Sequence, residues 1–276
     1  MSEGENWARQ LLADLRAAGF GLHAWRRFVA RSLERADERR RERAREHRQT
    51  LVLGALGLAA WAALALAGEL TLAAAGAAWW ALTILMLDWH LGMLERRDGT
   101  PIGTIGLPNL LSLARVGAVP ALPALAPALL AAALASAAAT NALDGLLARR
   151  RDQVSRLGFW LDGVADALVL STVAVVAAAD GKLPVWAAVL VVARFALPAA
   201  AIVGSYFLML QPPSARPVRG RVVGIALWAG LVIALLDAPL GAELTALGAV
   251  GGLAASAATA RVQRSATRHP RRATVG

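Results

Sequence analysis

Three aspartates and one asparagine carry the chemistry that this sequence indicates: Asn141, Asp144, Asp162 and Asp166. They stand in two apolar segments that meet in a short basic connection centred near Gln153. Asp144 and Asp162 lie nine residues from that midpoint, and Asn141 and Asp166 lie twelve and thirteen residues from it. If the segments are antiparallel helices, each pair falls at a matching depth, because both helices rise by about 1.5 Å per residue. The spacing therefore predicts that the four side chains converge.

Clustered carboxylates without histidine or cysteine are hard oxygen ligands, which suit Mg²⁺, Mn²⁺ or Ca²⁺ better than zinc. Two such cations about 3.5–4 Å apart can stabilise both the attacking and the leaving oxygen of a phosphoryl transfer. Four arginines of the basic connection could hold an anionic pyrophosphate. They are Arg149, Arg150, Arg151 and Arg156.

A structural role is the alternative for the aspartates, which would then pair with Arg115, Arg149 or Arg194 and hold the helices together. An aspartate in a transmembrane helix costs about 2.5–3.5 kcal/mol on insertion scales, so a cluster of three favours a functional site.

The elements that position these residues are apolar blocks of about 20 residues, the length of a membrane span. The chain has 276 residues, of which 57% are hydrophobic. Eight spans are expected, and they cover Leu51–Gly68, Leu70–Leu94, Leu107–Leu125, Ala126–Ala148, Gly158–Ala179, Pro184–Leu210, Val222–Leu236 and Leu244–Ala260. Because the chain has no cysteine, disulfides, zinc–thiolate sites and thiol catalysis are excluded.

The loop charges predict the orientation of these spans. Of the 29 lysines and arginines, 26 fall in the N-terminal segment, in every second loop and in the C-terminal tail, whereas loops of the opposite parity hold only Lys182. Positively charged loops stay in the cytoplasm. We therefore expect a multi-pass protein of the cell membrane with both termini and the aspartate cluster on the cytoplasmic side.

The N-terminal segment has apolar residues at helical spacing from Leu22 to Leu33, with arginines interleaved. This pattern is typical of a helix in the headgroup region of an anionic leaflet, or of a solvated charged helix. Asp88 and His90 could indicate a metal or proton relay, but their place beside Trp89 favours headgroup-level solvation. The net charge of +10 does not indicate nucleic acid, because aromatic stacking and basic-patch patterns are missing.

The central motif reads Asp144-Gly145-x2-Ala148-Arg149-x8-Gly158-x3-Asp162-x3-Asp166. It resembles the signature of the CDP-alcohol phosphotransferases (CDP-alcohol phosphatidyltransferases), and the resemblance extends over about residues 107–260. Upstream it includes six positions that look like the family's first core helix. They are Pro108, Asn109, Leu110, Ser112, Arg115 and Pro120.

The resemblance implies a six-helix core, and together with the two expected spans before residue 107 it predicts an all-α polytopic membrane protein with a six-helix core preceded by two extra transmembrane helices. The corresponding domains are a basic juxtamembrane helix (1–50), a two-helix extension (51–98), a catalytic core (107–260) and a basic tail (261–276). It also implies transfer of a phosphatidyl group from CDP-diacylglycerol, or a related CDP-alcohol, to an acceptor alcohol, with release of CMP during phospholipid biosynthesis.

The matching positions imply a metal site of two Mg²⁺ or Mn²⁺ ions held by Asp144, Asp162 and Asp166, with Asp166 also the general base. Four positions would contact the CDP group, namely Gly145, Ala148, Arg149 and Gly158. A phosphorylated acceptor could be bound by five arginines, although these could equally be positive-inside residues. They are Arg115, Arg194, Arg216, Arg219 and Arg221.

One position departs from the family pattern, because Asn141 stands where the family has its first aspartate. An asparagine carbonyl can still ligate a hard cation, but the site loses one negative charge. The alternative function is therefore a non-catalytic scaffold, or a lipid- or nucleotide-binding subunit. The expected partners are the lipid bilayer, the two substrates and, as a further option, a second copy of the chain. A transporter is less favoured, since no inverted repeat or broken-helix pair is visible.

Overall fold

A computed structural model describes residues 3–96, 98–208, 219–238 and 240–268, without side chains for residues 3–6, 219–221 and 260–268. Within these ranges the chain is helical, apart from short turns and one isolated β-bridge. The chain divides into two compact units, Met1–Thr172 and Val173–Gly276, and α7 runs from the first into the second.

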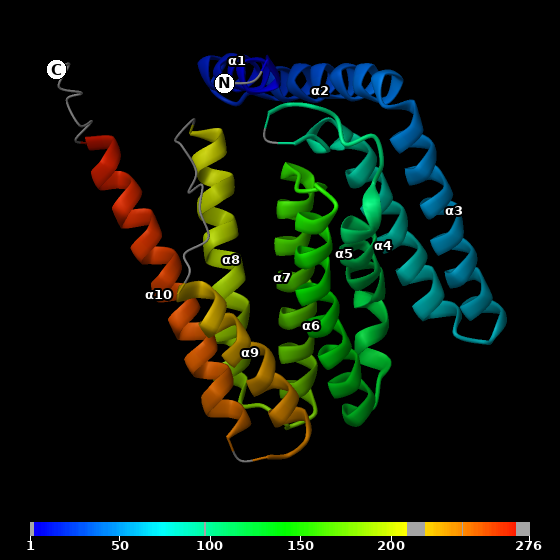
Figure 1. The fold of residues 1–276 in the computed structure, drawn as a ribbon, viewed down its shortest axis with the longest axis vertical. Coiled ribbons are helices and arrows are strands. Elements are labelled where there is room, and N and C mark those ends of the chain that lie inside the picture. The colour runs from blue at the N-terminus through cyan, green and yellow to red at the C-terminus, as the bar shows by residue number, and fades with distance from the viewer. Residues whose placement is uncertain (1–2, 97, 209–218, 239, 269–276) are drawn as a thin grey trace. The chain divides into compact units, whose positions relative to one another are not determined.

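The first unit begins with α1 (Glu3–Ala17) and α2 (Leu22–Glu42), which are joined by a tight turn. Gly19 and Phe20 adopt the left-handed conformation there, with φ of 61° and 57°. The helical spacing predicted from Leu22 to Leu33 is confirmed in α2, whereas the segment 1–50, predicted as one basic helix, contains both α1 and α2 as separate helices. In Figure 1, α2 runs across the direction of the two helices that follow it in the chain.

Those helices are α3 (Ala44–Leu66) and α4 (Leu70–Trp89), which pack against each other. Glycines make room for tryptophans at this contact, since a Cβ at Gly57 would overlap the Trp80 indole and one at Gly76 would overlap Trp61. The Trp80 indole N–H also donates to the Gly54 carbonyl at 3.1 Å. A buried aromatic ring thus has its polar atom satisfied.

The end of α4 is held to α2 by Asp88. This buried carboxylate accepts from Arg40 Nε at 2.6 Å and contacts His47 Nδ1 at 2.6 Å. The expected headgroup-level solvation of Asp88 is therefore wrong, because its charge is buried and paired within the protein. His90 is exposed, and its Nδ1 lies 2.7 Å from the Met86 carbonyl oxygen.

A short 3-10 turn, η1 (Leu91–Met93), leads into a hairpin-like loop between Leu94 and Ile105. Glu95 and Pro101 form an antiparallel β-bridge in it. Then α5 (Gly106–Ala118) begins and passes directly into η2 (Val119–Ala124). Pro120 and Pro123 account for the change, because proline has no N–H for the α-helical hydrogen bond.

Helices α6 (Pro127–Arg150) and α7 (Arg156–Ala179) carry the aspartates. The chain reverses between them in five residues, and the Gln153 N–H closes α6 by donating to the Ala148 carbonyl at 2.9 Å. The Ser155 hydroxyl oxygen accepts from the Gly158 N–H at 2.9 Å and so caps the start of α7.

The second unit contains the end of α7, followed by α8 (Val185–Phe207), α9 (Arg219–Leu235) and α10 (Gly241–Arg268). Helices α9 and α10 approach closely through glycines, because a Cβ at Gly230 would overlap Thr245 and one at Gly248 would overlap Leu227. Outside the helices, Lys182 pairs with Asp237 at 2.6 Å.

All eight expected helices are present among the described residues. Six of them are long and apolar enough to cross a membrane, namely α3, α4, α6, α7, α8 and the Gly241–Thr259 part of α10. Helix α5 has only 13 residues before η2, and the apolar part of α9 is short, at Val222–Leu235. The protein is an all-α polytopic membrane protein in which α3 and α4 precede the six-helix core α5–α10.

Candidate active site

The guanidinium of Arg115, on α5, contacts all three aspartates of the central motif. Its Nη2 donates to Asp144 at 2.5 Å and to Asp162 at 3.2 Å, and its Nη1 donates to Asp166 at 2.7 Å. The side chains of Arg115 and Asp144 are only 4% and 7% exposed, whereas those of Asp162 and Asp166 keep 20% and 18%. A buried charge of this kind is tolerable because it is paired and hydrogen-bonded.

Two neutral side chains complete this cluster. Asn141 Nδ2 donates to both carboxylate oxygens of Asp166 at 3.0 Å, and the Ser112 hydroxyl donates to Asp144 Oδ2 at 3.2 Å. The four residues predicted to converge from α6 and α7 do lie together, and α5 adds two more. We call this set of six side chains the carboxylate cluster.

The donor set of the carboxylate cluster fits a hard divalent cation, since it offers three carboxylates and a carboxamide. Three aspartates and one arginine leave two negative charges, which one divalent cation would balance. A second divalent cation would give the site a net positive charge, which an anionic pyrophosphate would balance. In the described part of the chain, however, no three His, Cys, Asp or Glu side chains are arranged as a metal site. Arg115 holds the carboxylates instead. The alternative of a structural role predicted such a pairing with Arg115, Arg149 or Arg194.

A cavity of about 640 Å³ opens beside the carboxylate cluster, between the start of α5, the end of α6 and the start of α7. Six residues assigned to metal or CDP line it, namely Asp144, Gly145, Ala148, Arg149, Gly158 and Asp162. Asn141 and Asp166 are not among the lining residues, and they join the carboxylate cluster through their contacts with each other and with Arg115. One cavity therefore reaches both the carboxylates and the residues that the resemblance assigns to the nucleotide.

The two glycines of the motif serve different purposes. A Cβ at Gly145 would meet only the Arg149 guanidinium, at 3.4 Å, so this position leaves the cavity open. A Cβ at Gly158 would lie 2.8 Å from Asn109 Oδ1 and 3.2 Å from Ser155 Oγ. Gly158 therefore allows close packing of α7 against α5.

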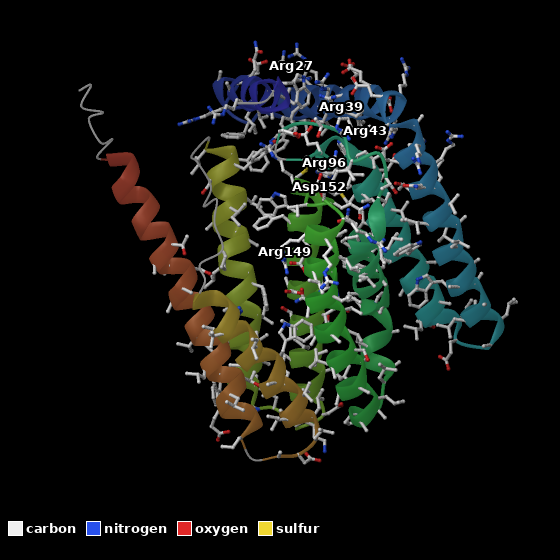
Figure 2. All side chains as sticks on the ribbon, viewed as in Figure 1. Arg27, Arg39, Arg43, Arg96, Arg149 and Asp152 are labelled. Carbon is white, nitrogen blue, oxygen red and sulfur yellow. The ribbon has the colours of Figure 1, made fainter. Side chains whose placement is uncertain are left out.

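The cavity mouth contains residues that the sequence did not single out. Arg96 and Asp98 come from the loop before α5, and Asp152 and Gln153 come from the α6–α7 connection. Arg96 Nε donates to Asp152 Oδ2 at 2.8 Å. Figure 2 labels this pair and also Arg149, which lies in the last turn of α6. The Thr100 backbone N–H and hydroxyl lower the pKa of Asp98 by hydrogen bonding to its carboxylate. The Asp98-Gly99 dipeptide is a strong hairpin signal, and it could have indicated that this loop turns back on itself.

The other arginines predicted to bind the acceptor all belong to the second unit. Arg194 belongs to the second unit, where its Nη1 donates to the Gly248 carbonyl at 2.8 Å. A Cβ at Gly252 would overlap the Arg194 guanidinium, so α10 is shaped around this side chain. Arg216 lies outside the described residues, as do the side chains of Arg219 and Arg221.

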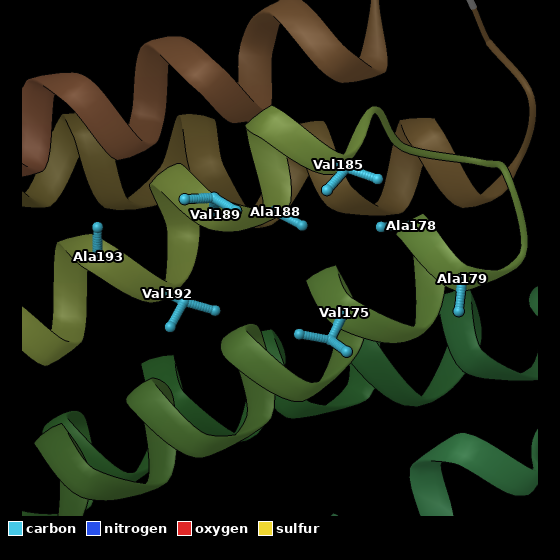
Figure 3. Close-up of a pocket in the computed structure, with 8 residues that line it drawn as sticks. All are labelled: Val175, Ala178, Ala179, Val185, Ala188, Val189, Val192 and Ala193. Atoms are coloured by element: carbon cyan, nitrogen blue, oxygen red, sulfur yellow. The ribbon is translucent and has the colours of Figure 1, made fainter.

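A second cavity, of about 490 Å³, lies in the second unit between α7 and α8. Its lining consists of valine and alanine side chains such as Val175 and Val189 (Figure 3). None of these side chains can bind a metal or transfer a proton, so this cavity is not a catalytic site.

A comparison with known protein families finds the same family that the central motif resembles. Residues 105–258 match the family model described as CDP-alcohol phosphatidyltransferase, which is more than half of the chain. A search of the curated proteins returns no match. The matched range begins just before α5 and includes the whole carboxylate cluster, and it leaves α1–α4 outside.

Proposed function

Because the chain belongs to the CDP-alcohol phosphatidyltransferase family, we propose that it transfers a phosphatidyl group from CDP-diacylglycerol to an acceptor alcohol in phospholipid biosynthesis. The observation that carries this proposal is the single cavity that reaches from Asp144 and Asp162 to Arg149. Carboxylates suited to metal binding and a cation suited to a nucleotide phosphate thus share one space. Phosphoryl transfer depends mostly on such positioning and charge neutralisation.

In the proposed reaction, the acceptor oxygen forms a bond to the phosphorus that carries the diacylglycerol. The bond from that phosphorus to the CMP oxygen breaks, and CMP leaves. Asp166 takes the proton of the acceptor hydroxyl as general base. Gly145, Ala148, Arg149 and Gly158 contact the CDP group, with Arg149 the one that carries positive charge.

Asp144, Asp162, Asp166 and the Asn141 carbonyl would hold the Mg²⁺ or Mn²⁺ ions, two of which the resemblance implies. When bound, the ions neutralise phosphate charge and stabilise the leaving oxygen. Before binding, Arg115 keeps the three carboxylates close together without mutual repulsion. The Asn141 side chain would have to turn its carbonyl oxygen toward the metal, because its amide nitrogen now faces Asp166.

A lipid donor fits a site at one end of the membrane spans. The carboxylates lie within α6 and α7, whereas the mouth of the cavity is formed by the polar connection that follows Arg150. We propose that the mouth faces the cytoplasm, where CMP is released, and that the termini lie on the same side. A phosphorylated acceptor is one substrate class that the arginines would favour.

The second candidate is a non-catalytic lipid- or nucleotide-binding protein. The observation that favours it is Asn141 together with Arg115, since the first removes a negative charge from the carboxylate cluster and the second neutralises another. A pocket with a weakened metal site could still bind a CDP-lipid.

An assay with the purified protein in lipid vesicles distinguishes the two candidate functions. Purified protein in lipid vesicles is given CDP-diacylglycerol, Mg²⁺ or Mn²⁺, and glycerol 3-phosphate, inositol phosphate or an unphosphorylated alcohol in parallel reactions. A transferase forms a new phospholipid, seen by mass spectrometry, and forms none after EDTA. A binding protein retains CDP-diacylglycerol without converting it with any of these acceptors.

A further inference from the structure

We propose that Arg96, which lies outside the family core, binds a phosphate group of the substrates at the mouth of the active-site cavity. This inference rests on the proposed function, because it concerns the same cavity. The phosphate can come from the CDP pyrophosphate or from a phosphorylated acceptor. The family match begins at residue 105, so Arg96 would be a substrate contact that this chain has added to the core.

The loop that carries Arg96 is built as a fixed support. Its two ends, Leu94 and Ile105, are buried. Arg43 Nη1 donates to the Leu94 carbonyl at 2.7 Å, and Gln49 Oε1 accepts from the Ile105 N–H at 2.9 Å. Helix α3 and the residue just before it therefore hold both ends of the loop in place.

Within the loop the backbone is also fixed around Arg96. Its N–H donates to the Thr100 carbonyl at 2.9 Å, and Gly99 turns the chain with a φ of 86°. The side-chain Nη1 lies 3.2 Å from the Pro101 carbonyl oxygen, to which it donates. The guanidinium is thus directed to the cavity mouth before any ligand arrives, which lowers the entropic cost of binding.

The present partner of Arg96 is one that an anionic ligand can replace. Asp152 is 82% exposed and Arg96 is 33% exposed, so their ion pair lies in a highly solvated environment. Exposed ion pairs of this kind contribute little to stability. A pyrophosphate or phosphate monoester offers the guanidinium a planar, two-bond contact that is stronger.

The surroundings of Arg96 favour a phosphate over other anions. Arg149 lines the same cavity from α6, and the first turn of α7, at Ser155 and Gly158, lines it as well. A helix start carries partial positive charge that attracts phosphate, although the Gly158 N–H itself donates to Ser155 Oγ. Two arginines and a helix start therefore surround one space next to the carboxylate cluster.

The test compares Arg96→Ala with Asp152→Asn in protein held in lipid nanodiscs. Asparagine keeps the shape of Asp152 and tolerates its left-handed backbone, with φ of 51°. Arg31→Ala is the matched control, because it breaks an exposed ion pair between Arg31 on α2 and Asp14 on α1, neither of which lines the cavity. Binding of CDP with Mg²⁺ is measured by calorimetry. The KM for glycerol 3-phosphate and the kcat are measured from CMP release, and the melting temperature checks folding.

We expect Arg96→Ala to weaken CDP binding, or to raise the KM for glycerol 3-phosphate, by roughly tenfold or more, because a hydrogen bond to a charged group is lost. A change in CDP binding identifies the donor pyrophosphate as the ligand, and a change in the acceptor KM alone identifies the acceptor phosphate. Asp152→Asn should bind as well as the wild type or better, since it removes a competitor for Arg96. The control should be unchanged.

The inference is overturned if Arg96→Ala changes neither quantity, or if both variants weaken binding equally, as a purely structural pair would. Wild-type protein that binds CDP and releases CMP in those cases leaves the proposed function standing. Wild-type protein that neither binds CDP nor releases CMP refutes both.

Discussion

At the scale of single residues, the carboxylate cluster depends on Arg115. This side chain reaches the three aspartates from a third helix and is itself almost fully buried. Without it, three carboxylates within a membrane protein would repel one another and take up protons. Arg115 thus holds the three carboxylates close together, in an arrangement from which they could bind a divalent cation.

Asn141 gives a sharp test of metal binding at this cluster. Asn141→Asp would place a carboxylate against Asp166, where the amide now donates two hydrogen bonds. We expect lower thermal stability in EDTA, a larger gain on adding Mg²⁺ or Mn²⁺, and a several-fold lower metal concentration at half-maximal effect, since hard cations prefer charged oxygen ligands. Melting curves over a metal titration give all three quantities.

The outcome for Asn141→Asp also separates the functional alternatives. A metal response equal to that of the wild type would mean that this position does not face the metal. Gain of CMP release from an inactive wild type would indicate a decayed enzyme, whereas loss of release from an active one would indicate a site adapted to the carboxamide.

The sequence predicts the residues of this site better than their partners. Equal helical rise on either side of Gln153 places Asn141 and Asp166 at one depth, and their hydrogen bonds show that this holds. The spacing of the aspartates does not predict which arginine side chain contacts them from a third helix. Arg115 was therefore only one of three arginines considered as their partner. Arg96 was missed because its partner Asp152 is 56 residues away in the sequence.

At the scale of elements, Asp88 holds α2 to the end of α4. Arg40 bridges from this buried carboxylate to Asp37, whose side chain is 58% exposed. We expect Asp88→Asn to lower the melting temperature clearly, because breaking a buried ion pair typically costs about 3–5 kcal/mol. Asp37→Asn is the matched control and should cost no more than about 1 kcal/mol.

Circular dichroism or fluorescence melting in detergent would measure both variants. Equal melting temperatures for Asp88→Asn and the wild type would show that α2 is not anchored through this residue. Apolar periodicity predicts α2 and apolar runs predict α3 and α4, but neither pattern predicts this anchor. In the sequence, an isolated Asp beside a tryptophan looks the same whether its side chain is solvated or paired with an arginine of another helix.

The positions at which helices end are also predicted only in part from the sequence. The core spans were found from runs of apolar residues, and α6 and α7 agree with them to within a few residues at their inner ends. The end of α5 at Ala118 was overlooked, although Pro120 and Pro123 mark it. Apolar composition continues through η2, so hydropathy alone does not register the change of backbone.

At the scale of the whole molecule, the basic loops predict which side of the membrane each helix end faces. The chain has no cysteine, so single cysteines can be placed freely. Arg151 and Asp180 are exposed residues just beyond opposite ends of α7. We expect Asp180→Cys to react with an impermeant thiol reagent from outside intact cells and Arg151→Cys to react only after permeabilisation.

The reverse labelling would put the cavity mouth outside the cell. The site would then be on the wrong side for cytoplasmic CMP and nucleotide-activated lipid, and the proposed function would have to be abandoned. Labelling of both positions from outside would instead show that α7 does not span the membrane.

The most direct test of the central claim is CMP release by purified protein in vesicles with CDP-diacylglycerol, Mg²⁺ and an acceptor. Asp166→Asn keeps the size of the side chain but removes the proton acceptor, and general-base catalysis is worth about 10²–10⁴-fold. Asp180→Asn is the matched control, because it makes the same change just beyond the other end of α7. The account predicts metal-dependent CMP release by the wild type and the control. It predicts that Asp166→Asn releases CMP at least about a hundredfold more slowly, the lower end of the range for general-base catalysis. Undiminished release in Asp166→Asn, or none from the wild type with any acceptor, would contradict it.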